Sequence, residues 1–249
     1  MIAIILAGGF AVRLGHLARN TPKPLLKVGG KPIIDHILDK LKDQGEIEKV
    51  VVATSTRFEQ QFKDWLSQSR YPKVCIRPEV SKSDKDKPGA IKSLSDVMEE
   101  FDSDSYLIIA GDNLFTSDLK DFFQRFRDKN HAVIAIHDVK QRELAKEFSV
   151  LEIDADGRII TFQEKPEQPR TTLIGTCIYL LPKKSLRRTD EYLKEGGNPD
   201  SPGYFVQWLS KKEPVDGYLL PGEWWDIGTP ESYKEALKAF NNYEKTCTR

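Results

Sequence analysis

Small residues that follow the first apolar run of the chain could form a loop that holds phosphate. The run from Ile2 to Leu6 is rich in isoleucine, which is typical of a parallel strand buried on both faces. Ala7, Gly8 and Gly9 come directly after it. Because their side chains are small or absent, backbone N–H groups can approach an anion closely, and glycine also allows positive φ. This stretch therefore indicates an anion-binding loop at the end of a strand.

Two cations between Leu6 and Val28 are of types that suit phosphate. Arg13 offers a forked, permanently charged donor that matches phosphate oxygens. Lys23 lies between two prolines, whose restricted backbone stiffens the segment and aims the ammonium group. Taken singly, a Gly-Gly pair after a strand is more often a turn, and a loop cation is more often solvated. The ordered combination is what predicts phosphate binding.

Two aspartates far apart in the sequence have the chemistry of metal ligands. Asp112 comes just after the apolar run from Tyr106 to Ala110, and Asp226 follows two tryptophans and precedes Gly228. Each aspartate alone is more often a turn or capping residue. As a pair of hard oxygen ligands they fit Mg²⁺, which keeps waters and substrate phosphates in its shell.

The first half of the chain alternates apolar strands with amphipathic helices, which predicts an α/β fold with a parallel sheet. Right-handed crossovers would then bring the loops that begin at Ala7, Arg77 and Asp112 to the carboxyl edge of the sheet, where such sheets bind ligands. The predicted strands are 2–6, 50–53, 74–76, 106–110 and 132–136, and the helical stripes run over 32–41, 58–66, 91–101 and 119–126.

The second half is richer in β-structure. An Asp/Gly turn at 154–157 separates two β-rich runs and predicts a hairpin of 148–153 with 158–164. Further strands are expected at 173–181 and 215–220, and helices at 183–194, 204–209 and 230–240. We predict one domain over 1–249, in which the pattern changes at about residue 137.

Composition limits the class of partner. Lys plus Arg and Asp plus Glu both number 38, so the net charge is zero, which argues against nucleic acid or an anionic membrane as the main partner. Three scattered cysteines offer neither a disulfide framework nor a zinc spacing. The run from Ile2 to Leu6 is too short to span a bilayer. We therefore expect a cytoplasmic protein, for which self-association into a homo-oligomer stays open.

The ordered string in Leu6 to Val28 resembles the signature of the sugar nucleotidyltransferases. That signature reads Leu-Ala-Gly-Gly-x-Gly-Thr-Arg-Leu and is followed by Pro-Lys-Pro-Leu. The resemblance extends from Ile2 to about Ala239. It implies a Rossmann-like α/β fold whose mostly parallel sheet has helices on both faces, together with a β-rich sugar-binding portion. The nucleotide-binding part would cover about 1–137, and the sugar-binding part with the C-terminal helix about 138–249. The end of the chain at Arg249 leads us to expect no C-terminal β-helix.

The resemblance implies roles for the first group of residues. In that family the N-terminal segment wraps a nucleoside triphosphate, which would place Leu6, Ala7, Gly8 and Gly9 against the nucleotide. Arg13 would act on the leaving pyrophosphate and Lys23 on the α-phosphate region. Base recognition would fall to the loop from Arg77 to Gly89, where Gly89 resembles the family's glycine contact.

Later motifs would hold the metal and the sugar. Gly-Asp-Asn after a strand and Trp-x-Asp-x-Gly-Thr near the end are the family's metal-binding positions, so Asp112 and Asp226 would hold Mg²⁺. Glu-Lys-Pro would supply Glu164 to sugar hydroxyls and Lys165 to the sugar phosphate. Without the resemblance, Glu164 and Lys165 would be interpreted as a pair of surface charges before a turn. Gly175 matches a glycine beside the sugar.

Three positions depart from the family pattern. Ala11-Val12 replaces Gly-Thr in the phosphate loop, and Ser149 replaces the glycine of Phe-Gly-Val. Arg77-Pro78-Glu79 stands where thymidylyltransferases have a glutamine after the strand. These departures leave the choice of base open.

The sequence thus predicts an enzyme, a sugar-1-phosphate nucleotidyltransferase that uses glucose 1-phosphate with dTTP or UTP as its favoured substrates. One alternative is the same transfer to a non-sugar phosphate such as phosphocholine or inositol phosphate. A second is a catalytically silent regulatory subunit, which Ala11-Val12 would favour. A dinucleotide-binding oxidoreductase is disfavoured because the Gly-x-Gly-x-x-Gly spacing is absent.

Overall fold

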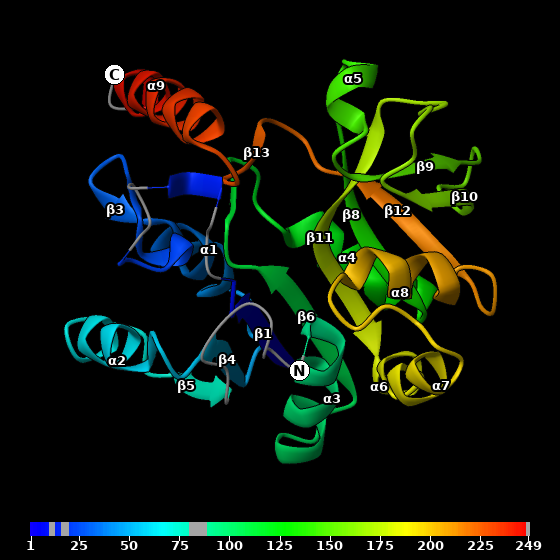
Figure 1. The fold of residues 1–249 in the computed structure, drawn as a ribbon, viewed down its shortest axis with the longest axis horizontal. Coiled ribbons are helices and arrows are strands. Elements are labelled where there is room, and N and C mark those ends of the chain that lie inside the picture. The colour runs from blue at the N-terminus through cyan, green and yellow to red at the C-terminus, as the bar shows by residue number, and fades with distance from the viewer. Residues whose placement is uncertain (10–12, 16–19, 80–88, 248–249) are drawn as a thin grey trace.

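A computed structural model describes residues 1–9, 13–15, 20–79 and 89–247, with side chains up to residue 240. Among these residues the central feature is a nine-stranded sheet in which β10, β9, β11, β6, β1, β4 and β5 lie side by side, while β8 pairs with β11 and β12 (Figure 1). The strands are β1 Ile2–Ala7, β4 Lys49–Ser55, β5 Val74–Glu79, β6 Ser105–Ala110, β8 Ala132–Asp138, β9 Ser149–Ile153, β10 Ile159–Glu164, β11 Leu173–Pro182 and β12 Val215–Leu219.

Strand direction agrees with a mostly parallel sheet. The β6-β1-β4-β5 half is parallel throughout, and β12 is parallel to β8. β11 runs antiparallel to its neighbours β6, β8 and β9, and β10 runs antiparallel to β9. β10 and β11 are therefore the described strands of this sheet that oppose the rest. The sheet is parallel around the predicted phosphate loop and mixed where the predicted sugar site begins.

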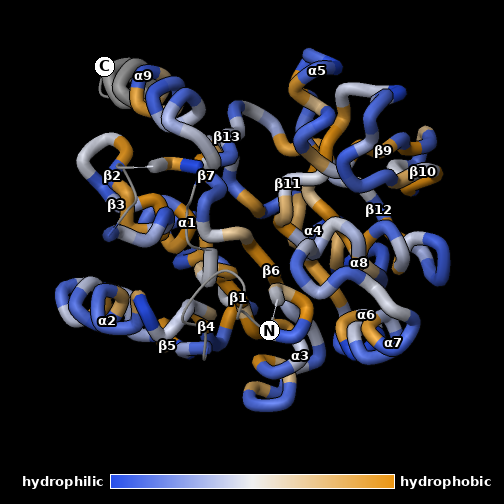
Figure 2. The backbone as a smooth tube through the Cα atoms, viewed as in Figure 1, coloured by the Kyte–Doolittle hydropathy of each residue, from blue (hydrophilic) through white to orange (hydrophobic). Residues whose placement is uncertain are grey.

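Helices cover both faces of the sheet, as predicted. Two buried clusters lie on opposite faces: α1, α2, α4 and α9 contribute to one, and α3, α6, α7 and α8 to the other. β1 is buried on both faces. Its successive residues alternate between the two clusters: Ala3 and Ile5 belong to the first, and Ile2 and Ile4 belong to the second. Figure 2 shows this arrangement as apolar central strands enclosed by helices with polar outer faces.

The helices are α1 Ile33–Leu41, α2 Glu59–Ser67, α3 Ala90–Glu100, α4 Lys120–Lys129, α5 Arg142–Ala145, α6 Lys183–Leu186, α7 Thr189–Lys194, α8 Pro202–Leu209 and α9 Pro230–Cys247. A 3₁₀ turn, η2 Lys23–Leu25, and two short ladders, β2 Lys27–Val28 with β3 Lys31–Pro32 and β7 Asn113–Phe115 with β13 Trp224–Asp226, complete the described elements. No helix in the described part of the chain is both long and apolar enough to cross a membrane.

Two predictions about elements can be compared directly with the structure. The hairpin is confirmed: β9 and β10 are antiparallel, and Gly157 closes the turn with a φ of +82° and an N–H bond to the Asp154 carbonyl at 3.1 Å. The single helix over 183–194 is wrong, because the structure has α6 and α7 in its place. The Thr189 hydroxyl donates to the Leu186 carbonyl at 2.8 Å, so a side chain satisfies an acceptor where a continuous helix would use the backbone.

Candidate active site

The phosphate loop and the Asp112 turn are fastened together by backbone contacts. Gly111 donates its N–H to the Leu6 carbonyl at 2.9 Å. A Cβ on Gly111 would lie 2.7 Å from Pro24 Cγ and 3.0 Å from the Leu6 oxygen, so glycine is needed for this close approach. Since Pro24 packs on Gly111, its neighbour Lys23 is brought to Asp112, where Lys23 Nζ lies 2.8 Å from Asp112 Oδ2.

A short ladder brings the second aspartate to the first. β13 pairs with β7, so that Asp226 lies opposite Asn113, and the Ile227 N–H donates to the Asp112 carbonyl at 3.0 Å. Trp224 fixes the register, because its indole N–H donates to the Asn113 side chain. The sequence predicted that the two aspartates work together, but the ladder that joins them was not predicted.

The charge of this aspartate pair is incompletely balanced. Burial raises the pKa of Asp226 to about 7, and the nearby Asp112 carboxylate acts in the same direction, while Lys23, Arg13 and Lys165 oppose the rise. Burial acts to lower the pKa of Lys23, but its ion pair with Asp112 outweighs that effect and raises it. Among the described residues, Lys23 is the cation that bonds to this pair, and together with Arg13 and Lys165 it offsets only part of the rise in the pKa of Asp226.

The two carboxylates offer a donor set for one kind of ion. No group of three or more His, Cys, Asp or Glu side chains that could hold a metal occurs among the described residues. Two hard oxygens in an electronegative setting fit Mg²⁺, which takes one or two carboxylates and fills the rest of its shell with water and substrate phosphate. The residues present therefore fit the predicted ion.

A cavity of about 170 Å³ opens beside the aspartates and contains the predicted sugar-site residues. It is lined by Arg13, Asp112, Glu147, Ser149, Glu164, Lys165, Gly175, Cys177, Ser201, Gly203, Trp224 and Asp226, among others. Arg13, Asp112 and Asp226 come from the nucleotide and metal motifs. The structure therefore brings Arg13, both aspartates and the predicted sugar residues to one cavity, and Lys23 reaches it through its bond to Asp112.

Glu164 is held in this cavity by neighbours that the sequence did not reveal. Ser149 donates its hydroxyl to one carboxylate oxygen, and Ser201 donates to the other at 2.9 Å. Gln207 accepts the backbone N–H of Glu164 at 2.7 Å, and a Cβ on Gly203 would overlap the carboxylate. Ser149, the departure from Phe-Gly-Val, thus orients a predicted substrate residue. The Ser-Pro-Gly run at 201–203 was the available signal.

The remaining predicted residues of this cavity have distinct surroundings. Lys165 follows the end of β10 with a φ of +45° and donates its backbone N–H to the Phe148 carbonyl at 3.0 Å. Arg13 is exposed, and its guanidinium lies 3.9 Å from Glu147. A Cβ on Gly175 would make only ordinary contacts, the nearest at 3.5 Å to Ser149 Cβ, so the protein around it does not itself require glycine. Ala11-Val12 lies outside the described residues.

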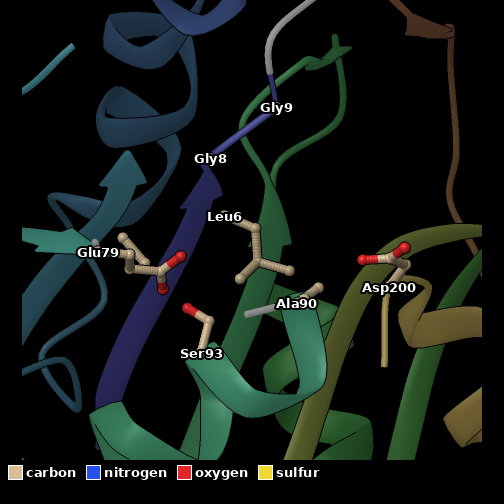
Figure 3. Close-up of a pocket in the computed structure, with 9 residues that line it drawn as sticks. Leu6, Gly8, Gly9, Glu79, Ala90, Ser93 and Asp200 are labelled. Carbon is tan, nitrogen blue, oxygen red and sulfur yellow. The ribbon is translucent and has the colours of Figure 1, made fainter. Parts of the chain in front are cut away.

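A second cavity, of about 150 Å³, lies beside the phosphate loop (Figure 3). Its walls are Leu6, Gly8, Gly9, Ala53, Glu79, Gly89, Ala90, Ser93 and Asp200. Ala7 is buried next to it, and its carbonyl accepts the Thr54 hydroxyl at 3.2 Å. Leu6, Gly8, Gly9 and Gly89 thus share one cavity, as expected of nucleotide-binding residues.

One expectation about this second cavity needs correction, and one predicted residue has a further role. The predicted loop does not begin at Arg77, because β5 continues to Glu79, and the Arg77 guanidinium turns to Glu100 at 2.9 Å. Glu79 lines the cavity instead. Gly89 has a φ of +87°, and a Cβ there would collide with the Pro199 backbone, so a packing contact already requires glycine at this position.

The fold and the two cavities, which the consecutive residues Asp200 and Ser201 line one each, place the predicted phosphate, metal and sugar residues together in an α/β protein. The family model for nucleotidyl transferases matches residues 2–243. The chain therefore belongs to the nucleotidyl transferase family.

Individual relatives agree with this family. The chain is 32% identical over 241 residues to the bifunctional protein GlmU of Methanocaldococcus jannaschii, a match that covers 96% of this chain and 54% of the relative. The chain thus spans about half the length of this curated relative.

Solved structures show the same fold. A Bacillus anthracis protein assigned as a glucose-1-phosphate thymidylyltransferase, crystallised with a sucrose, is 26% identical with a TM-score of 0.82, over 96% of this chain and 95% of that one. A UDP-glucose pyrophosphorylase complexed with UDP-glucose is 20% identical with a TM-score of 0.81, over 97% of this chain and 98% of that one.

Proposed function

We propose that this protein is a sugar-1-phosphate nucleotidyltransferase. An oxygen of the sugar phosphate attacks the α-phosphorus of a nucleoside triphosphate in line. The bond from the α-phosphorus to the bridging oxygen breaks, and pyrophosphate leaves with that oxygen and its electron pair. Such a reaction needs positioning and charge neutralisation rather than covalent protein chemistry.

The observation that carries this proposal is the acidic pair in the cavity that holds Glu164. Asp112 and Asp226 line that cavity, and the bond from the Gly111 N–H to the Leu6 carbonyl fastens the Asp112 turn to the cavity beside the phosphate loop. Among the described residues, Lys23 bonds to Asp112 and balances only part of the charge of the pair. Two anionic substrates that meet at such a place repel each other unless cations lie between them. The arrangement supports a site that joins two phosphorylated molecules.

The side chains divide this work by position. Lys23, held at the aspartates, would contact the α-phosphate region, and Arg13, whose guanidinium is exposed at the cavity mouth, would contact the leaving pyrophosphate. Lys165 would hold the attacking sugar phosphate, and the carboxylate of Glu164 keeps lone pairs for sugar hydroxyls beyond those used by Ser149 and Ser201.

We propose that Asp112 and Asp226 hold Mg²⁺. When bound, the ion would neutralise phosphoryl charge at the point where the two substrates meet. The remaining work falls to the chain itself: the ladder of β7 and β13 fixes the spacing of the two carboxylates, and the packing of Pro24 on Gly111 fixes Lys23.

The favoured substrates are glucose 1-phosphate with UTP or dTTP. The name of the Bacillus anthracis structure contains glucose 1-phosphate and thymidylyl transfer, and the pyrophosphorylase structure was solved with UDP-glucose. These names support the choice by similarity of fold. Residues of about 1–137 would bind the nucleotide and those of about 138–249 the sugar, in a cytoplasmic enzyme whose scattered cysteines suit a reducing compartment.

Pyrophosphate release tests this function directly. The full chain is incubated with Mg²⁺ and each common triphosphate, paired with glucose 1-phosphate, other sugar 1-phosphates, phosphocholine and inositol phosphate. We expect release only with a sugar 1-phosphate, fastest with UTP or dTTP, and its loss when EDTA removes Mg²⁺. Release confined to a non-sugar acceptor, or absent from every pair, would contradict the proposal.

A further inference from the structure

One residue that lines the cavity of the aspartate pair has a backbone conformation that favours glycine. Cys177 lies inside β11 with a φ of +57°, in the left-handed region that other side chains rarely adopt. Among the described residues the other non-glycine positions with positive φ are Asn130, Lys140 and Lys165, and each of them comes just after the end of a helix or strand. Cys177 thus holds, in the middle of a strand, a conformation that its own side chain disfavours.

A bulge in β11 accounts for this conformation. Because Gly175 and Tyr179 pair with residues of β8 that are only two apart, three residues of β11 lie opposite the single residue Ala135. The Thr176 hydroxyl donates to the Ala135 carbonyl at 2.9 Å, so a side chain satisfies an acceptor where the ladder is interrupted. The bulge frees Cys177 from the regular alternation of the strand.

The bulge lies where β11 changes its neighbour on the other side. β11 pairs with β9 up to Gly175 and with β6 from Ile178 onward (Figure 1). The chain continues from β6 into the Asp112 turn, and the hairpin of β9 and β10 ends at Glu164. Cys177 therefore lies between the strand that leads to the aspartate pair and the hairpin that carries the predicted sugar ligand.

The Cys177 side chain adds bulk but no charge to the cavity. Cys177 is partly exposed, and the hydroxyl of the buried Tyr179 donates to its thiol. Burial raises the pKa of Cys177 to about 12, and the nearby carboxylates of Asp112, Glu164 and Asp226 act in the same direction, while the bond from Tyr179 opposes the rise. The thiol is therefore neutral, and it lies close to both the aspartate pair and Glu164.

We propose that Cys177 limits the size of the sugar that this cavity accepts, and that it excludes hexose 1-phosphates in which an acetamido group replaces the hydroxyl on C2. This inference rests on the proposed function, which places the sugar phosphate at Lys165 and the aspartate pair and the sugar hydroxyls at Glu164. The ring carbon next to the phosphorylated carbon then lies between those groups, which is where the thiol lies. A hydroxyl group there would contact the thiol, whereas the larger acetamido group would overlap it.

The discrimination would depend on the size of the side chain rather than on thiol chemistry. The thiol is uncharged, and its sulfur already accepts a hydrogen bond from Tyr179. A glycine at position 177 would suit the backbone and leave more room in the cavity. Removing the side chain should therefore admit the larger sugar, while a hydroxyl group of nearly the same size should still exclude it.

Calorimetry with glucose 1-phosphate and N-acetylglucosamine 1-phosphate tests the inference. Binding is measured with Mg²⁺, both without nucleotide and with a UTP analogue whose α,β-bridging oxygen is a methylene group, so that no transfer occurs. We expect the wild type to bind glucose 1-phosphate at least about tenfold more tightly, the scale on which a pocket rejects a group of a few atoms. Cys177→Gly should reduce this ratio to below about threefold by gaining affinity for the N-acetylated sugar.

Three further variants complete the design. Cys177→Ser keeps a side chain of similar size and should keep the discrimination. Cys75→Ser changes a cysteine on β5 that lines neither of the two cavities and should behave as the wild type. Melting temperatures identify any variant that fails to fold, and Cys177→Ala, which removes only the sulfur and should relax the ratio in part, keeps the test valid if the glycine variant is lost.

Three results would overturn the inference: equal or tighter binding of the N-acetylated sugar by the wild type, an unchanged ratio in both Cys177→Gly and Cys177→Ala, or a relaxed ratio in Cys177→Ser. Failure of the proposed function looks different. Selective binding without pyrophosphate release in any pair would remove the transfer reaction and leave the role of Cys177. Release at equal rates with both sugars would do the reverse, and a wild type that binds no hexose 1-phosphate would contradict both.

Discussion

Two acidic sites in this protein differ in how their negative charge is balanced. Asp216 on β12 is 2% exposed and has three basic neighbours: Arg125 at 2.8 Å, His131 at 2.9 Å and Lys129 at 3.6 Å. Asp226 on β13 shares its site with Asp112, and Lys23, the cation among the described residues that bonds to this pair, bonds to Asp112.

Their pKa values show the difference. Burial acts to raise the pKa of Asp216, but the hydrogen bond to His131 and the charges of Arg125 and Lys129 hold it below its usual value. Burial raises the pKa of Asp226 to about 7, and Asp112 adds to the rise. A carboxylate whose charge is balanced by neighbouring basic side chains contributes to the stability of the fold. A pair left short of positive charge indicates a site for an external cation.

The largest effect should come from neutralising one carboxylate of the unbalanced pair. Replacing Asp112 or Asp226 with asparagine is expected to lower kcat at least about 100-fold, the scale of losing one charge contact in the transition state. Asp226→Asn should also leave the free energy of unfolding unchanged or raise it by roughly 0.5–2 kcal/mol, since it removes repulsion with Asp112.

Pyrophosphate release and urea unfolding measure these two quantities, with the exposed Asp43→Asn as control. Unchanged turnover in Asp226→Asn would remove that residue from the reaction. A large loss of stability would instead place Asp226 with Asp216 as a structural carboxylate, and the comparison between the two sites would fail.

Neutralising Asp216 should have the opposite effects, a loss of stability without a loss of turnover. Asp216→Asn leaves three basic groups without their shared partner, and we expect it to lower the free energy of unfolding by roughly 2 kcal/mol. The value lies below that of a fully buried pair because the three partners are 19–34% exposed. Turnover per folded molecule should stay at the wild-type level.

Urea unfolding and pyrophosphate release again provide the two readouts. Stability equal to that of the Asp43→Asn control would show that the three contacts to Asp216 contribute nothing measurable. A fall in kcat of the folded variant would connect β12 to the reaction, although Asp216 does not line the cavity that contains the aspartate pair.

The sequence predicted the features that depend on hydrophobic periodicity and on the order of the strands along the chain. The apolar runs of β1, β4 and β6 are buried on both faces, so their pattern indicated a parallel sheet, and Asp112 and Gly8 were expected at one edge because parallel strands end there. Asp112 and Asp226 were paired by their ligand chemistry, whereas Glu164 and Lys165 were added to the site only through the resemblance to a family.

What the sequence could not predict depends on contacts between distant side chains. The pairing of β7 with β13 joins residues about a hundred positions apart, and strands of three residues give no periodic signal. Ser149 and Ser201 orient Glu164 from different elements. Glu79 was assigned to a loop, because the end of β5 lies in a run of charged residues with no apolar pattern.

The smallest predicted effect is the pH dependence of the stability that Asp216 contributes. A carboxylate whose pKa is lowered in the folded state stabilises the protein above its unfolded pKa, and that contribution is lost as pH falls through the folded pKa. For Asp216 the unfolded value is near 3.8 and the folded value lies below it. The difference in unfolding free energy between the wild type and Asp216→Asn should therefore shrink as pH falls below about 4.

Urea unfolding of both proteins across this pH range measures that difference, with Asp43→Asn compared in parallel to remove the general effect of acid. A difference that persists unchanged well below pH 4 would mean that packing around residue 216, rather than the carboxylate charge, stabilises the fold. Asp216 would then cease to be the charged counterpart of Asp226, and the contrast between a balanced and an unbalanced carboxylate would rest on Asp112 and Asp226 alone.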